Sequence, residues 1–256
     1  MYSQKFLRCT GIAIFLGISS MLYSQIANIE KRRISDSATG WFGSAYLNFA
    51  GSKTTKSTLN LSAGTLLEYK SKDSLDLWLL ITDFGLISGD KEKFTDFGFG
   101  HLRYNHKFGP AIRWEAFTQI QYNSLVKINK RALFGTGPRF KLTKYENAKF
   151  YWGVAYMYEY EEVNDSTMLH QDHRISSYFT FTLLPEETVT FVSTTYAQPL
   201  IKDLGDFRIL NETNLSLEIS KKLTFNFSFR YAYDSQPPVE VPKNTYAFSN
   251  GLLLEF

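Results

Sequence analysis

Charged side chains recur at every second position in several long stretches of the sequence. Arg113 and Glu115 alternate with Trp114 and Ala116, and the alternation continues as far as Asn123. Because alternate residues of a β-strand point to the same face, this pattern predicts strands with one charged and one apolar face. By parity, we predict that eight residues line the lumen of the protein: Arg103, Arg113, Glu115, Arg131, Arg139, Glu159, Glu212 and Arg230.

Two kinds of chemistry suit such a charged interior. The side chains could line a small aqueous pore and select ions, or they could pair with one another and fill the space. Similar numbers of cations and carboxylates share the inward parity, and an unpaired charge in a confined interior is costly, so the balance favours pairing. Two functions remain open: a narrow passive channel with a charged lumen, and a structural or interaction protein with an occluded lumen that acts through its external loops.

Residues for hydrolytic catalysis are poorly arranged. A hydrolase needs a nucleophile, a histidine base and an orienting group within hydrogen-bond reach. The histidines are His101, His106, His170 and His173, and no Gly-x-Ser-x-Gly motif accompanies them. A lipase role for His106 is weaker than a role as an interfacial residue near a turn. We therefore expect no enzymatic activity.

A second cluster mixes carboxylates with imidazoles in residues 161–173, which include Glu161, Asp172 and His173. Such side chains bind divalent metals. Their spacing in a loop is not specific, however, and a hydrated, charged loop explains it better. We predict no metal site and no cofactor.

The apolar faces of the same stretches predict that the strands separate lipid from water. Strands of about 12 residues reach roughly 40 Å, which is enough to cross a bilayer at the tilt of a barrel. Aromatic side chains on one face and charges on the other suit a wall between lipid and water. Twelve such strands are predicted from Gly40 onward, an even number, as single-chain bacterial barrels have. The predicted fold is all-β, a closed up-and-down antiparallel transmembrane β-barrel of about 12 strands.

The lengths of the predicted links and the positions of the tryptophans predict how the barrel is oriented in the membrane. Predicted long links, such as 162–173, 198–206 and 235–243, alternate with short ones, which places the long loops outside the cell and both termini in the periplasm. One tryptophan falls near the start of each of the first four odd-numbered strands, where it would join an aromatic girdle at the inner membrane interface. These girdle residues are Trp41, Trp78, Trp114 and Trp152.

The two ends of the sequence carry targeting features. Lys5 and Arg8 precede an apolar run, so residues 1–24 are expected to be a signal peptide, 25–39 a periplasmic extension and 40–256 the barrel. Removal of 1–24 takes away Cys9, the sole cysteine, and excludes disulfides and a cysteine nucleophile. The last strand alternates in polarity and ends on Phe256, which resembles the assembly signal of outer-membrane barrels.

Composition agrees with this assignment. The chain is 16% aromatic, with 22 Phe and 16 Tyr, which is high for a water-soluble domain. Its formal net charge of +3 falls to about +1 without the basic residues of the predicted signal peptide, so no strong basic field indicates nucleic acid.

Three sequence runs resemble a known family. They are His101-Leu-Arg-Tyr-Asn, Glu115-Ala-Phe-Thr-Gln-Ile-Gln-Tyr-Asn and Lys130-Arg-Ala-Leu-Phe-Gly-Thr-Gly-Pro-Arg. They are similar to domain-of-unknown-function family 481, labelled a salt-induced outer membrane protein, over roughly residues 40–162. The resemblance implies an outer-membrane β-barrel of a Gram-negative bacterium with no established biochemical activity. Its expected partners are outer-membrane lipid and the barrel-assembly machinery, with an unidentified extracellular partner.

Overall fold

The computed structural model describes residues 39–90, 92–143, 145, 147–163, 169–186 and 188–254. The predicted signal peptide (1–24), the predicted extension apart from its last residue, and Phe256 lie outside these residues.

Strands make up nearly all of the described chain. One short 3₁₀ helix, η1 (Ser124–Val126), interrupts them. The strands are β1 (Gly40–Lys53), β2 (Ser57–Lys70), β3 (Asp76–Gly89), β4 (Glu92–Lys107), β5 (Ile112–Asn123), β6 (Ile128–Lys141), β7 (Ala148–Val163), β8 (Leu169–Glu186), β9 (Val189–Leu200), β10 (Asp203–Ser220), β11 (Leu223–Asp234) and β12 (Asn244–Leu254).

The strands form one sheet in strict sequence order from β1 to β12, and every neighbouring pair is antiparallel. The prediction of an all-β, twelve-stranded antiparallel fold is therefore confirmed. The edges of the sheet are β1 and β12, and in the described chain these two strands pair only with β2 and β11. The predicted closure of the sheet into a barrel is therefore not confirmed.

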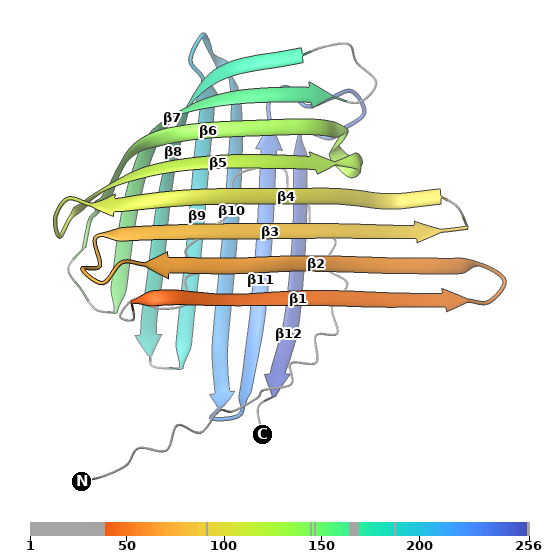
Figure 1. Ribbon diagram of the computed structural model, residues 1–256, viewed down its shortest axis with the longest axis horizontal. Helices are drawn as coiled ribbons and strands as arrows, with labels where there is room; N and C mark the ends of the chain where they lie inside the picture. Colours follow the sequence, from red (N-terminus) through yellow and green to blue (C-terminus); the bar gives the residue numbers. More distant parts are fainter. Residues whose placement is uncertain are drawn as a thin grey trace.

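The sheet curls over on itself. In Figure 1, β1 to β4 run across the view, whereas β9 to β12 run up and down behind them. Residues on the inner face therefore meet residues of distant strands. One such cluster joins Phe117, Met157, Tyr178 and Tyr196 from β5, β7, β8 and β9. The curl of the sheet thus encloses an interior, in which side chains of strands that are not neighbours pack together.

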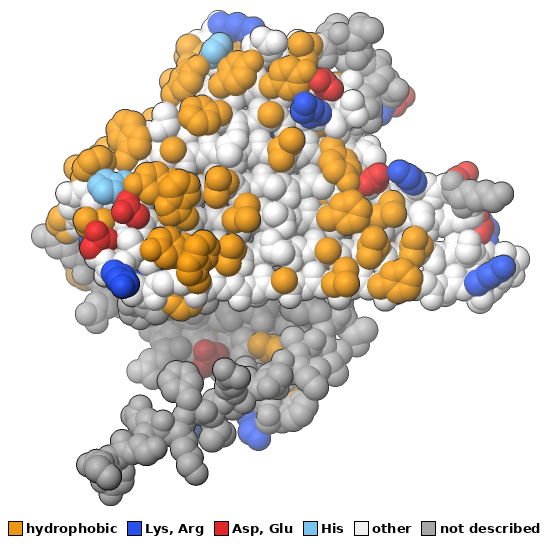
Figure 2. All heavy atoms as spheres, in the orientation of Figure 1, with side chains coloured by type: hydrophobic (Ala, Val, Ile, Leu, Met, Phe, Trp, Pro, Cys, Tyr) orange, Lys and Arg blue, Asp and Glu red, His pale blue; other side chains and the backbone are white. Residues whose placement is uncertain are grey.

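The two faces of the sheet have opposite characters. On β5, Trp114 and Ile120 are about half exposed, whereas Glu115 and Gln119 between them are buried. Figure 2 shows large hydrophobic side chains over the outer face of the front strands. In the described part of the chain, no helix is long and apolar enough to cross a membrane.

The predicted alternation of long and short links is wrong. The link between β9 and β10 is only residues 201–202, and β8 already begins at Leu169, so the predicted loops 198–206 and 162–173 are mostly strand. The links after β2 and β4, at 71–75 and 108–111, exceed the two-residue links after β3 and β9. Polar residues near these strand ends pair inside the protein, which is why they mimic loops in the sequence. Of the links we predicted to be long, 235–243 keeps its full predicted length.

Candidate functional site

The eight predicted lumen residues lie on the inner face of the sheet. Six of them are buried, and Arg113 and Arg230 are half-buried. The buried six are Arg103, Glu115, Arg131, Arg139, Glu159 and Glu212. Two ion-pair clusters organise most of these side chains, with Arg230 and Glu212 forming a separate pair at 3.6 Å.

The first cluster is centred on Glu115 of β5. Its Oε2 lies 3.3 Å from Nη1 of Arg103, and its Oε1 lies 3.2 Å from Nη1 of Arg139. The hydroxyl of Tyr178, on β8, donates a hydrogen bond to Oε2. The Arg139 guanidinium also stacks over the Tyr151 ring, 4.0 Å from its centroid. One carboxylate thus holds strands β4, β5, β6 and β8 together.

Amide and imidazole groups extend this cluster along the inner face. Nδ1 of His101 lies 3.0 Å from Oε1 of Gln119, whose Nε2 donates to Oε1 of Gln121 at 2.7 Å. Nε of Arg103 lies 3.3 Å from Nε2 of His101. Buried polar groups are stable only when they are hydrogen-bonded, and this chain of contacts meets that requirement.

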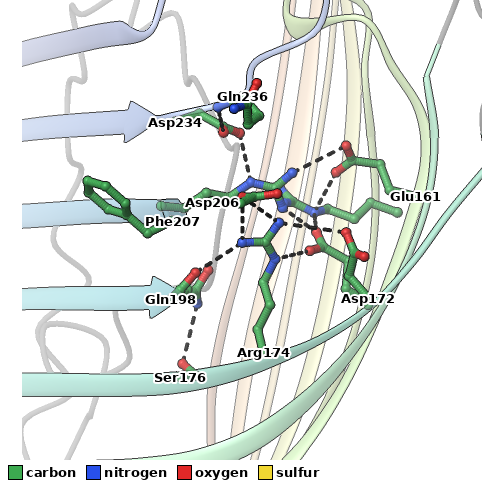
Figure 3. A network of polar contacts seen from close by, with 12 residues as sticks. Glu161, Asp172, Arg174, Ser176, Gln198, Asp206, Phe207, Asp234 and Gln236 are labelled. Carbon is green, nitrogen blue, oxygen red and sulfur yellow. Dashed lines mark hydrogen bonds and ion pairs between the residues drawn. The ribbon is translucent and has the colours of Figure 1, made fainter. Parts of the chain in front are cut away.

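The second cluster surrounds Glu159 and Glu161 of β7. Arg131 of β6 pairs with both carboxylates and lies 2.9 Å from Oε2 of Glu161. Arg174 of β8 donates from Nε to Oε2 of Glu159 at 2.8 Å. Arg208 of β10 reaches Oε1 of both glutamates and lies 3.4 Å from that of Glu161. Figure 3 shows Glu161 and Arg174 converging with carboxylates from several strands.

Three aspartates supply further carboxylates to the arginines of the second cluster. Both Nη atoms of Arg174 donate to Oδ1 of Asp206 at 3.1 Å, and Nη2 lies 3.7 Å from Asp172. Nε of Arg208 donates to Oδ2 of Asp234 at 2.7 Å. In Figure 3 the labelled side chains of Asp172, Asp206 and Asp234 point toward the same centre. The second cluster thus sets five carboxylates around three arginines, and Nζ of Lys202 adds a fourth cation 3.4 Å from Oδ1 of Asp172.

Sequence reasoning missed four members of the second cluster: Arg208, Asp172, Asp206 and Asp234. Arg208 has the same parity as Glu212 on β10, so strand alternation could have found it. Asp172 and Asp206 fell in segments predicted to be loops, and no local signal places them beside Arg174. Their positions depend on strands β8 and β10 running to 18 residues each.

Little space remains between these side chains. A cavity of about 40 Å³ lies beside Arg131, Glu161, Arg208 and Asp234, and one of about 10 Å³ lies beside Arg103, Glu115 and Tyr178. A cavity needs on the order of 10–15 Å³ to hold a water molecule, so these cavities hold only a few. In this conformation the side chains of the two clusters fill the part of the interior in which they lie.

A segment that we name the strap, residues 235–243, covers the larger cavity. Pro237, Pro238 and Val241 of the strap line that cavity opposite Val126 of η1. The backbone N–H of Phe207 donates to Oγ of Ser235 at 2.8 Å, which fixes one end of the strap.

An ion pair ties the strap to the far side of the sheet. Nζ of Lys127, next to η1, donates a hydrogen bond to Oε2 of Glu240. This hydrogen bond and the charge of Lys127 hold the pKa of the exposed Glu240 carboxyl below its usual value. The strap is therefore held at its first residue and near its middle, beside the cavity of the second cluster.

In the described residues, no group of three or more His, Cys, Asp or Glu side chains is placed to hold a metal ion. Within residues 161–173, where the sequence mixes carboxylates with imidazoles, Asp172 pairs with Arg174 and Lys202. Nδ1 of His173 hydrogen-bonds to the hydroxyl of Tyr156.

The predicted girdle residues lie on the outer face. Trp41 is 67% exposed, and Trp78, Trp114 and Trp152 are each 44% exposed. Strand pairing aligns Trp41 with Tyr69, Tyr69 with Trp78 and Trp78 with Tyr104. Adjacent rings pack closely, with centroids 4.8 Å apart for Trp41 and Tyr69 and 4.6 Å apart for Trp78 and Tyr104. Aromatic side chains therefore form a row across the first strands at the edge where β1 begins.

These features define the class of protein: one curled, twelve-stranded antiparallel sheet with an ion-paired inner face and an apolar outer face. The chain belongs to the family described as "Protein of unknown function, DUF481", which matches residues 45–256. The family predicted from the three sequence runs is therefore confirmed, and the match continues through the C-terminal half, beyond those runs.

Comparisons with individual proteins complete this description. Among curated proteins, none matches the chain. A solved NanC porin in a rhombohedral crystal form is 12% identical with a TM-score of 0.46, covering 82% of this chain and 100% of that one. A bacterial polysaccharide outer membrane secretin is 8% identical with a TM-score of 0.46, covering 84% and 80%. A KdgM porin is 10% identical with a TM-score of 0.44, covering 84% and 99%.

Proposed function

We propose that the protein is an integral outer-membrane β-barrel whose interior is occluded at rest by its own ion pairs. The observation that carries this proposal is the reversed polarity of the sheet. Arg103, Arg139 and Arg174 are each 1% exposed on the inner face, whereas Phe134 and Trp114 on the outer face are about half exposed. A water-soluble protein would gain free energy by the opposite arrangement, but a hydrocarbon solvent favours this one.

In the bilayer the barrel closes by pairing β1 with β12. An unpaired strand edge exposes backbone N–H and C=O groups, each of which costs several kcal/mol in hydrocarbon. The outer faces of both edge strands carry exposed apolar residues, such as Phe49 on β1 and Phe248 on β12. Closure would therefore extend one continuous apolar surface around the barrel.

Both termini lie in the periplasm in this proposal. An even number of antiparallel strands brings the start of β1 and the end of β12 to the same edge of the sheet. The strap lies at the opposite edge, because it follows an odd-numbered strand. That placement makes the strap an extracellular segment, through which an external partner could be bound.

The occluded interior favours a closed barrel over a passive open channel. Each buried carboxylate at the centre of the two clusters meets at least two arginines, which neutralises its charge without water. Movement of an ion through this level requires displacement of those pairs.

Conductance of the purified full-length protein in planar lipid bilayers tests the proposal. We expect no steady conductance from the natural protein and discrete steps from a Glu159→Gln variant, which removes the charge shared by three arginines. Glu162→Gln is a matched control, because Glu162 lies on the same strand with outward parity. Steady, open-channel conductance of the natural protein would instead establish the narrow passive channel, the alternative function.

The expected partners follow from the same proposal. Outer-membrane lipid contacts the outer face, and the barrel-assembly machinery recognises the last strand, whose terminal Phe256 lies outside the described residues. We further propose that the protein neither binds nucleic acid nor acts as an enzyme.

A further inference from the structure

A polar group of three side chains lies on the outer face among the aromatic residues. Asp76 begins β3, and His106 is its register partner on β4. Oδ1 of Asp76 accepts a hydrogen bond from the Tyr104 hydroxyl at 2.6 Å and lies 2.7 Å from Nδ1 of His106. The side chains of Asp76 and His106 are about one-third exposed, at 34% and 33%.

Aromatic rings surround this group. The Trp78 ring packs on Tyr104, and the Phe108 ring meets the edge of His106 with centroids 4.8 Å apart. Trp114 is the register partner of His106 on the other side. In Figure 2, acidic and histidine side chains lie beside hydrophobic ones at the end of the front face where β3 begins and β4 ends. This combination of exposed rings and polar groups is typical of headgroup depth in a membrane wall.

Two polar atoms of the group remain available. Both contacts of the Asp76 carboxylate use Oδ1, and both contacts of the His106 ring use Nδ1. Within the described part of the chain, Oδ2 of Asp76 and Nε2 of His106 have no hydrogen-bond partner. A carboxylate oxygen accepts from an ammonium group, and an imidazole nitrogen that carries a proton donates to a phosphate oxygen.

We propose that Asp76, His106 and the rings around them bind the headgroup of a phospholipid that carries a primary ammonium group beside its phosphate. This inference rests on the proposed membrane location. The ammonium group contacts Oδ2 of Asp76 and the face of a neighbouring ring, Trp78 or Trp114, while the phosphate contacts Nε2 of His106. The site sets a carboxylate oxygen beside an imidazole nitrogen, which suits the neighbouring ammonium and phosphate groups of a zwitterion.

The charge of Asp76 discriminates between lipids. An anionic headgroup without a cation would place its charge near Asp76 without compensation. The site should therefore prefer phosphatidylethanolamine to phosphatidylglycerol. Exposed charge pairs are weak, so we expect an enrichment of roughly fivefold.

Lipid competition tests this preference. The full-length protein is reconstituted in bilayers of equimolar phosphatidylethanolamine and phosphatidylglycerol, extracted in mild detergent, and its retained lipids are counted by native mass spectrometry. We expect about fivefold enrichment of phosphatidylethanolamine on the natural protein and none on Asp76→Asn. Asp73→Asn is the control, because Asp73 is a similarly charged, exposed residue in the adjacent turn 71–75. It should keep the enrichment.

Two results would overturn the proposal: equal enrichment on the natural protein and Asp76→Asn, or equal loss in Asp76→Asn and Asp73→Asn. Heat-dependent electrophoretic mobility reports whether each variant has folded. If Asp76→Asn does not fold, His106→Gln takes its place, with the same expected loss. Failure of the natural protein to insert in bilayers would refute the proposed function, whereas insertion without enrichment would refute only the lipid site.

Discussion

Arg208 on β10 forms an ion pair with Glu159 on β7, although these strands are not neighbours in the sheet and the two residues are 49 positions apart in the chain. Arg131 and Arg174 hold the same carboxylate from the strands on either side of β7. Glu159 therefore connects β7 both to its neighbours β6 and β8 and, across the curl of the sheet, to β10.

Loss of this charge should destabilise the protein. Glu159→Gln leaves three buried arginines without their shared carboxylate, and breaking a buried ion pair typically costs about 3–5 kcal/mol. Urea titration, followed by the loss of heat-dependent mobility, measures the free energy of unfolding. Glu162→Gln should change it by less than about 1 kcal/mol. Equal effects of the two variants would show that the buried network does not stabilise the curl.

Close packing at one glycine gives a second prediction. A Cβ atom at Gly137 would lie 2.0 Å from the backbone oxygen of Val154, whereas one at Gly100 would lie no closer than 3.5 Å to its nearest neighbour, a side-chain atom of Ile120. Gly137→Ala should therefore lower the free energy of unfolding by about 1–3 kcal/mol or more, because the backbone of β7 must move. Gly100→Ala should have little effect. A larger loss in Gly100→Ala than in Gly137→Ala would contradict the packing of β6 against β7.

The strap should loosen in acid. Because the pKa of Glu240 is lowered in the folded protein, its ion pair with Lys127 is intact above the ordinary pKa of 4.5 and is lost as the pH falls through the lower, folded value. Hydrogen exchange in 235–243, corrected for intrinsic rates, should increase over that range. Glu240→Gln should show the faster exchange already at neutral pH and no acid step. A variant that exchanges as slowly as the natural protein would exclude this role for the ion pair.

Tryptophan fluorescence tests the outer face. All four tryptophans are at least 44% exposed there, so lipids brominated near the headgroup should quench most of the emission of the reconstituted protein. A water-soluble quencher should have a much smaller effect. Strong quenching by the aqueous reagent alone would place these rings in water and refute the proposed membrane contact.

Strand parity predicted much of this architecture from sequence. The alternation of Trp114 with Glu115 indicated which face is buried, because adjacent strand residues point to opposite sides. Parity does not identify the partners of those residues, however. The contact between Tyr178 and Glu115 depends on the curl of the sheet over 63 residues, which no local pattern encodes.

The limits of the predicted strands have a similar cause. Asp172 and Asp206 resemble loop residues because isolated acidic side chains favour solvent. Inside the protein, Arg174 contacts both and allows the strands to continue. Extension of β8 and β10 therefore depends on a tertiary ion pair, whereas the hydrophobic alternation of β5 is sufficient to predict that strand.

Reliance on distant partners also imposes an order on biogenesis. Glu115 cannot meet Tyr178 until β8 has been added, and Glu159 cannot meet Arg208 until β10 has been added. Before then Glu115 can pair only with Arg103 and Arg139, and Glu159 only with Arg131, so the concave side of the first seven strands remains open to water. Expulsion of that water accompanies the arrival of the last third of the chain, which makes completion of the sheet cooperative.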